Sequence, residues 1–214
     1  MRLDHVSYVA SHDQISDVVN RIGSQIGTAF VDGGIHPKFG TRNFTAPLLN
    51  GQYIEVVCPL DHPATDATPF GRAVKKKLLD GGGWMAWVIS VTDIEIAEKI
   101  LARNSVEGLR KKPDGTVLKW KQIGVLDVLN DSHNPIFIEW VSANHPSKDG
   151  SPKSKLSKIV MNGDSKNLNP KFKETFLEIS QSFEIIWEVT TENGTDPGIN
   201  YIEVETEGKR LKLL

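Results

Sequence analysis

Hydrophobic and polar positions in the first part of the chain follow the patterns of one helix and four strands. Short apolar runs typical of strands occur at residues 3–10, 28–31, 40–48 and 52–57. Segment 13–22 instead repeats its apolar residues at the spacing of one helix face. The pair Asn50-Gly51 separates two strand-like runs and predicts a hairpin. The predicted order is therefore strand, helix and three strands.

The same order of patterns returns later in the chain. The pattern predicts a strand at 84–91, a helix at 94–101, and three strands at 117–120, 123–129 and 136–141. Two of the predicted strands are near copies, Tyr53-Ile54-Glu55-Val56-Val57 and Phe137-Ile138-Glu139-Trp140-Val141. We infer that a βαβββ unit is duplicated within the chain.

The remaining segments join or extend these two units. We predict a first domain over 1–146, with units at 2–60 and 83–144 and a linker at 61–82 that includes a short helix at 70–79. Residues 147–214 are predicted to form a C-terminal extension with a partial third α/β unit. Its expected elements are strands at 158–161, 185–189 and 201–205 and a helix at 170–179.

Composition narrows the class of protein. Lys and Arg number 25 against 27 Asp and Glu, and this balance does not favour nucleic-acid binding. The single cysteine, Cys58, has no partner for an intrachain disulfide. No apolar run approaches the roughly 18 residues of a spanning helix, and the N-terminus is too polar for a signal peptide. We expect a cytoplasmic protein without membrane or nucleic-acid partners and, lacking a glycine-rich phosphate loop, without a nucleotide cofactor.

The two units carry motifs of a known superfamily. The first strand opens with Leu3-Asp4-His5, Gly33-Gly34-Ile35-His36-Pro37 follows, and each unit ends on a strand that bears a glutamate. These features resemble the vicinal oxygen chelate superfamily and, more narrowly, the bacterial glyoxalase-like domain proteins. The resemblance implies an α+β fold in which tandem βαβββ units form a cupped mixed sheet, followed by a C-terminal α/β extension. It also implies a divalent metal ion in the cup, whose coordination the substrate completes.

Carrying the superfamily pattern over residue by residue gives a candidate metal centre. The implied ligands are His5, Glu55 and Glu139, and this donor set suits Mn, Fe, Ni or Zn. Glu55 and Glu139 are also the candidate catalytic residues. The fourth ligand position falls on Trp87, whose indole nitrogen only donates hydrogen bonds, so one expected ligand is missing. His36, in a predicted turn after two glycines, is an alternative fourth ligand.

Several residues are candidates for binding a substrate beside this centre: His36, Thr41, Asn43, Trp87 and Trp120. Thr41 and Asn43 share one face of their predicted strand. The alternative is that these two side chains satisfy nearby backbone groups, and that the tryptophans of the second unit belong to the core.

Two functions are compatible with these residues. The first is a metal-dependent enzyme acting on a small oxygenated metabolite, either a glyoxalase-like lyase or isomerase or a dioxygenase-type metalloenzyme, with the ion as Lewis acid. The second is a metal-free protein that binds a small molecule in a Trp-lined cup. A homodimer is one possible assembly, although two units in one chain favour pairing within the chain.

Overall fold

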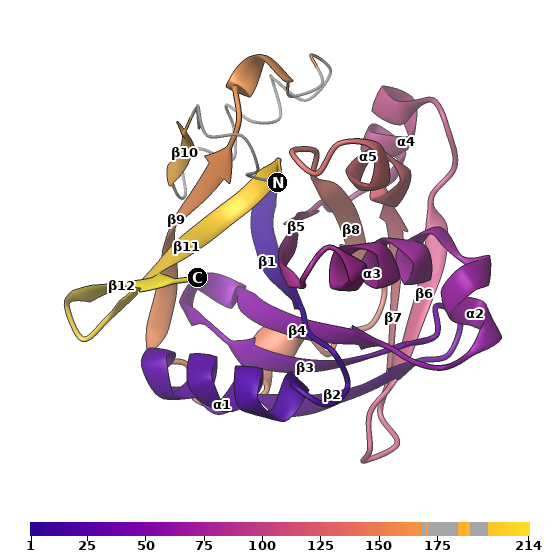
Figure 1. The fold of residues 1–214 in the computed structure, drawn as a ribbon. Coiled ribbons are helices and arrows are strands. Elements are labelled where there is room, and N and C mark those ends of the chain that lie inside the picture. The colour runs from indigo at the N-terminus through magenta and orange to yellow at the C-terminus, as the bar shows by residue number, and fades with distance from the viewer. Residues whose placement is uncertain (168–169, 171–183, 189–196) are drawn as a thin grey trace.

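The computed structural model describes residues 1–167, 170, 184–188 and 197–214. Its main feature is an eight-stranded sheet that closes on itself in the order β1-β4-β3-β2-β6-β7-β8-β5 (Figure 1). The strands are β1 (Arg2–Val9), β2 (Val31–His36), β3 (Thr41–Pro47), β4 (Tyr53–Pro59), β5 (Gly83–Ser90), β6 (Val106–Lys111), β7 (Val117–Ile123) and β8 (Ile136–Trp140). This confirms the cupped α+β fold.

Each half of the closed sheet is one βαβββ unit. The first unit carries α1 (Ile15–Ile26) after β1, and the second carries α4 (Glu95–Leu101) after β5. In both units the first strand pairs in parallel with the last strand. The antiparallel pairing of β1 with β5 joins the halves, and a shorter pairing of β2 with β6 closes the sheet. The predicted duplication therefore corresponds to two halves of one sheet.

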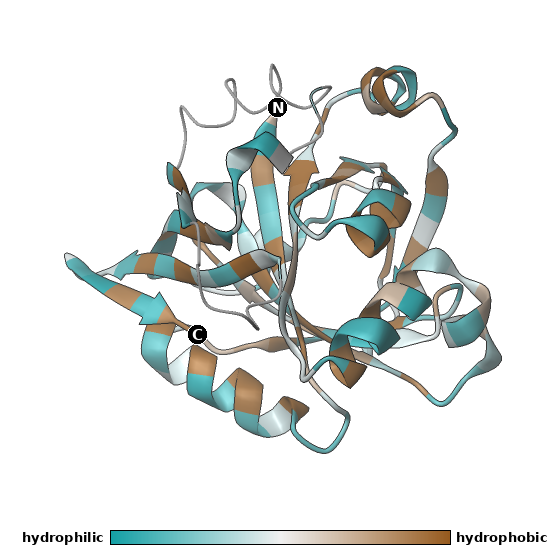
Figure 2. Cartoon of the chain, turned by 45° about the horizontal axis from the view of Figure 1, so that its top comes forward, coloured by the Kyte–Doolittle hydropathy of each residue, from teal (hydrophilic) through white to brown (hydrophobic). Residues whose placement is uncertain are grey.

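Helix α1 shows why these segments pack as they do. Apolar and polar residues alternate around it, visible as brown and teal bands in Figure 2. Its buried residues include Ile15, Ile22 and Ile26, which join the main hydrophobic cluster under the sheet. The helix ends at Gly27, which adopts a left-handed backbone with φ of 64° that suits glycine.

The connection between the units contains two helices, α2 (Pro63–Ala67) and α3 (Pro69–Leu79). The predicted helix at 70–79 is thus confirmed. Thr68 caps α3 because its side-chain oxygen accepts the backbone N–H of Gly71. Helix α3 contacts β4, β5 and α5 (Val125–Asn130).

A second sheet follows the closed one. It consists of β9 (Ser154–Asn162), β10 (Glu184–Glu188), β11 (Gly198–Thr206) and β12 (Lys209–Leu213), in the order β10-β9-β11-β12. It shares the hydrophobic cluster of the first sheet, and Trp84 Nε1 on β5 donates to the Leu213 carbonyl at 3.2 Å. The predicted strands at 158–161 and 201–205 lie within β9 and β11. The domain boundary at 146 stays a prediction.

Two predicted elements and one unpredicted strand need comment. The strand predicted at 123–129 is wrong, because Gly124, with φ of 112°, ends β7 and α5 begins at Val125. Strand β6 was not expected, since Gly108 interrupts its pattern. The helix predicted at 170–179 lies, apart from residue 170, outside the described residues. Within the described part of the chain, no helix is long and apolar enough to cross a membrane.

Candidate functional site

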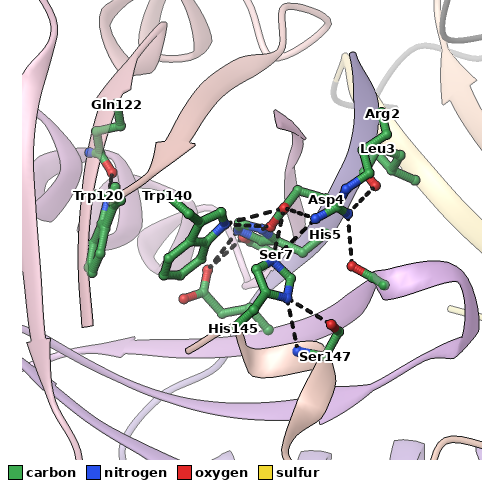
Figure 3. Close-up of polar contacts among 12 residues, drawn as sticks. Arg2, Leu3, Asp4, His5, Ser7, Trp120, Gln122, Trp140, His145 and Ser147 are labelled. Atoms are coloured by element: carbon green, nitrogen blue, oxygen red, sulfur yellow. Dashed lines mark hydrogen bonds and ion pairs between the residues drawn. The ribbon is translucent and has the colours of Figure 1, made fainter. Parts of the chain in front are cut away.

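A buried aspartate organises one side of the site. In the pairing of β1 with β5 the register shifts between Leu3 and His5, so Asp4 lies at a bulge in the strand. Its side chain is fully buried and accepts hydrogen bonds from His5 Nδ1 at 2.9 Å and His145 Nε2 at 3.1 Å. Arg2 forms an ion pair with it at 3.1 Å. Figure 3 shows both imidazoles converging on this carboxylate.

The partners of Asp4 keep it ionised. Burial alone would raise the pKa of Asp4, but the hydrogen bonds and charges of His145 and His5 hold it well below the usual range. An ionised carboxylate only accepts hydrogen bonds, so the His5 proton sits on Nδ1. The other ring nitrogen of His5, Nε2, then carries a lone pair whenever the ring is neutral.

Glu55 lies beside His5 and accepts hydrogen bonds from two other side chains, separate from those around Asp4. Ser7 Oγ donates to Glu55 Oε2 at 2.7 Å and Asn43 Nδ2 donates to Oε1 at 2.6 Å. His5 Nε2 is 3.8 Å from Oε2. Burial would raise the pKa of Glu55, yet the charges of His5 and His36 and these two hydrogen bonds lower it. Glu55 is therefore a fixed anion at the cavity.

Two further side chains come from matching strands of the two units. His36 Nδ1 contacts Thr41 Oγ1 at 2.9 Å, and burial lowers the pKa of His36 to about 4, with Glu55 opposing and Arg110 and His5 adding to the shift. His36 is thus neutral near pH 7. Arg110 is only 2% exposed, and its Nε and Nη2 atoms have no hydrogen-bond partner.

These side chains line one small cavity inside the closed sheet. Its polar wall includes His5, Ser7, His36, Glu55 and Arg110. The remaining lining is largely apolar or aromatic: Tyr53, Phe70, Val88, Trp120, Gln122, Ile136, Ile138 and Trp140. The Tyr53 ring stacks on His5 with centroids 4.3 Å apart, and Trp120 Nε1 donates to Gln122 Oε1 at 2.7 Å. The cavity thus presents charged, polar and apolar groups together.

The structure brings together part of the predicted site. His5, Glu55, His36 and Trp120 all line the cavity. Thr41 and Asn43 are buried and bond to His36 and Glu55, so they lie behind the lining side chains. They fix the orientation of two cavity residues.

Trp87 and Glu139 are placed elsewhere, which corrects their expected positions. Trp87 belongs to the core on the other face of β5, where its Nε1 donates to the His133 carbonyl at 3.0 Å. Glu139 Oε2 accepts the backbone N–H of Ile94 at 3.0 Å and so caps the start of α4. Neither side chain lines the cavity.

Strand registers explain both misplacements. His5 pairs with Tyr53 and Ser7 with Glu55, whereas Val88 pairs with Ile136 and Ser90 with Ile138. The matching residues of the second unit are therefore Val88 for His5 and Ile138 for Glu55. The sequence match is off by one residue, which turns a side chain to the opposite face of its strand.

Asp4, Ser7 and Arg110 were not identified as site residues from the sequence. Two glycines near Arg110, Gly33 and Gly108, show how closely its surroundings are packed. A Cβ atom at Gly33 would lie 2.9 Å from Arg110 Nη1 and 2.1 Å from Asn43 Oδ1. Neither Gly33 nor Gly108 has a positive φ, so both are glycine for reasons of space.

The residues present do not fit the implied metal ion. Among the described residues, no group of three or more His, Cys, Asp or Glu side chains could hold a metal. His5 and Glu55 are neighbours, but both oxygens of Glu55 already accept hydrogen bonds and Glu139 points to α4. His36 lines the same cavity but does not form a group of three metal-binding side chains with His5 and Glu55.

Comparison with known proteins agrees with this fold. Over its full set of described elements the structure resembles a hypothetical protein from Staphylococcus aureus, with a TM-score of 0.58 and 14% identity, covering 99% of this chain and 84% of that one. A methylmalonyl-CoA epimerase from Mycobacterium tuberculosis aligns with a TM-score of 0.42 and 13% identity, over 64% of this chain and 85% of the other. No curated protein matches the sequence. Residues 3–175 match the glyoxalase-like domain, and the chain therefore belongs to the glyoxalase-like domain family.

Proposed function

We propose that the protein is an enzyme that moves a proton on a small oxygenated molecule bound in the cavity, with His5 as the acid–base group. The observation that carries this proposal is the position of His5 Nε2. Asp4 bonds the Nδ1 side of the ring at 2.9 Å, and Nε2 lies 3.8 Å from Glu55 Oε2, too far for a hydrogen bond. Nε2 is therefore left for a substrate.

The surrounding carboxylates suit this role. When neutral His5 takes a proton at Nε2, an imidazolium forms between Asp4 on one side and Glu55 on the other. Both carboxyl groups have lowered pKa values and are ionised, so they stabilise the positive ring. An aspartate that fixes the tautomer and orientation of a catalytic histidine is a recurrent arrangement in enzymes.

His36 supplies a second interaction with the substrate. Because burial lowers the pKa of His36 to about 4, a neutral ring faces the cavity. A neutral imidazole has one donor and one acceptor nitrogen. With Nδ1 at Thr41, the Nε2 side is available to a carbonyl or hydroxyl group of the ligand.

We assign no step of this chemistry to a metal ion, because the described residues contain no group of three or more donor side chains that could hold one. The proposal predicts that dialysis against EDTA leaves the rate of proton exchange on the bound molecule unchanged. Added Mn, Fe, Ni or Zn should not raise that rate. Elemental analysis of the dialysed protein is the control for complete removal. If dialysis abolished this exchange and one of these ions restored it, the assignment of the chemistry to protein side chains alone would be contradicted.

Exchange of carbon-bound hydrogen for deuterium tests the proton transfer directly. We would incubate the protein in D₂O with 2-oxobutyrate, 2-oxobutyramide and 2-butanone and follow the proton next to each carbonyl by NMR. His5→Asn is expected to slow the exchange by about 10²-fold or more, the usual contribution of a general base. The matched control is His12→Asn, since His12 is exposed and outside the cavity.

The apolar wall favours one other function, binding without chemistry. Val88, Ile136 and Ile138 give the cavity a surface suited to retaining an apolar group. Saturable binding of these compounds without His5-dependent exchange would favour a binding protein over an enzyme. Equal exchange rates in wild type and His5→Asn would refute the role of His5.

A further inference from the structure

The guanidinium of Arg110 has no anion to pair with in the described structure. Arg110 lies on β6 and lines the cavity, and its Nε and Nη2 atoms are buried without hydrogen-bond partners. Arg2, Arg42 and Arg103 each have a carboxylate partner, namely Asp4, Asp32 and Asp127. Among the residues that the structure describes, none forms an ion pair with Arg110. It is the most buried arginine and yet it lacks such a partner.

A buried charge of this kind is costly to the folded protein. A guanidinium stays protonated in proteins and has five N–H donors that must find acceptors. Removing it from water without a partner destabilises the fold. The anion in the same cavity, Glu55, forms no ion pair with Arg110 and instead accepts hydrogen bonds from Ser7 and Asn43.

The chain makes room for this side chain. A Cβ atom at Gly33 would come within 2.9 Å of Arg110 Nη1. A Cβ atom at Gly108, two residues before Arg110, would come within 2.1 Å of the Trp120 ring, so that ring lies directly against β6. Both glycines thus leave space at the cavity end where Arg110 lies.

We propose that Arg110 binds the carboxylate of a small monocarboxylic acid, and that this anion is the ligand of the cavity. The planar guanidinium matches a carboxylate with two parallel N–H···O bonds. A single unpaired cation calls for a single negative charge, and the wall of Val88, Ile136 and Ile138 suits a short carbon chain. This inference rests on the proposed function of the same cavity and adds the substrate class to it.

A pair of probes that differ only in charge tests the proposal. Binding of 2-oxobutyrate and of its neutral amide, 2-oxobutyramide, is measured by ligand-observed NMR titration against the purified chain. Wild type is expected to bind the acid ~10-fold or more tightly than the amide, since a charge-assisted pair is stronger than a neutral one. Equal affinities, or no binding of the acid, would overturn the proposal.

Three variants test whether Arg110 causes the preference for the acid over the amide. Arg110→Met is expected to remove the preference for the acid, and Arg110→Lys to keep only part of it because lysine lacks the planar fork. Arg42→Met is the matched control, since Arg42 pairs with Asp32 outside the cavity, and the preference should persist in it. Preference for the acid that survives in Arg110→Met would refute the assignment.

Thermal unfolding gives a readout that does not depend on any ligand. Arg110→Met is expected to melt at a higher temperature than wild type, because an unpaired buried charge has been replaced by an apolar chain of similar length. A lower melting temperature would mean that the guanidinium is satisfied in the folded protein, and would contradict the premise.

The two proposals fail separately. If acid and amide bind equally while His5-dependent exchange persists, the carboxylate assignment is wrong and the proton-transfer function stands. If the acid binds through Arg110 but no exchange depends on His5, the ligand class stands and the enzymatic function is wrong. Competition by inorganic phosphate at the same concentration as the acid would instead indicate a general anion site and overturn the carboxylate class.

Discussion

The two halves of the closed sheet share a backbone plan but differ in what they present to the cavity. The registers match five pairs of positions, with the first unit's residue given first: His5 and Val88, Tyr53 and Ile136, Glu55 and Ile138, Asn43 and Trp120, His36 and Arg110. The first unit supplies the imidazoles and the carboxylate. The second supplies an apolar wall and one guanidinium.

This difference shows that duplicating a fold need not duplicate its site. The backbone repeats because each unit needs its partner to close the sheet, and buried apolar strands satisfy that need in either half. The cavity residues have no such constraint. A cavity whose two halves present different groups can fix the orientation of an unsymmetrical ligand, which two identical halves could not do.

The sharpest test of this comparison sets Glu55 against Glu139, the two glutamates that the sequence treats as equivalent. Glu55→Gln is expected to slow deuterium exchange by about 10²-fold, since it removes a charge beside His5. It should also lower the free energy of unfolding by roughly 1–3 kcal/mol, because an amide N–H would face the donor Ser7 or Asn43.

Glu139→Gln is the matched comparison. It weakens only the contact with the Ile94 N–H at the start of α4, so we expect a loss of about 1 kcal/mol or less in urea unfolding and an unchanged exchange rate. Equal loss of exchange in the two variants would contradict the division of roles between the halves.

His36, which occupies the position matching Arg110, has a lowered pKa that should make stability depend on pH. Because the pKa of His36 is about 4 in the folded protein and 6.5 is its ordinary value, the unfolded chain binds a proton between these pH values and the folded one does not. The free energy of unfolding should therefore fall as the pH drops from 6.5 to 4. The loss due to His36 is about 3 kcal/mol.

Urea unfolding across this pH range checks the prediction. His36→Gln should remove most of the slope, whereas His12→Gln, at an exposed site, should leave it in place. A slope that is unchanged in His36→Gln would show that burial of His36 does not depress its pKa as described.

A last comparison separates two tryptophans of the second unit by their effect on ligand binding. Trp87→Phe loses the hydrogen bond to the His133 carbonyl and leaves a cavity in the core, so it should cost roughly 2–3 kcal/mol in unfolding, with no change in ligand affinity. Trp120→Phe alters the cavity and frees Gln122, so it should weaken binding of 2-oxobutyrate. Weaker binding in Trp87→Phe would place this ring at the site after all.

The fold was largely predictable because the duplication leaves strong periodic patterns in both units. The site was less so, and Glu139 shows the reason. The sequences around Glu55 and Glu139 align well, but the strand pairing of the two units places Ile138, and not Glu139, at the position equivalent to Glu55. An error of one residue leaves a fold assignment intact and turns a site residue to the other face.

Asp4 and Arg110 escaped prediction for a different reason. Asp4 bonds His5 beside it because a bulge interrupts the regular alternation of β1, and a bulge depends on pairing with β5 across the fold. Arg110 lies on β6, where Gly108 interrupts the alternation of apolar and polar residues that would have predicted a strand. Both roles depend on contacts between segments that are distant in the sequence, and the hydrophobic periodicity of a single strand does not predict such contacts.

A crystal structure with bound 2-oxobutyrate would test most directly the claim that one half supplies the chemistry and the other holds the ligand. The account predicts the carboxylate in a two-bond contact with Arg110, and the methylene carbon next to the ketone turned toward His5 Nε2. A ligand bound outside the cavity, or one with its carboxylate at His5 and its carbon chain at Arg110, would contradict it.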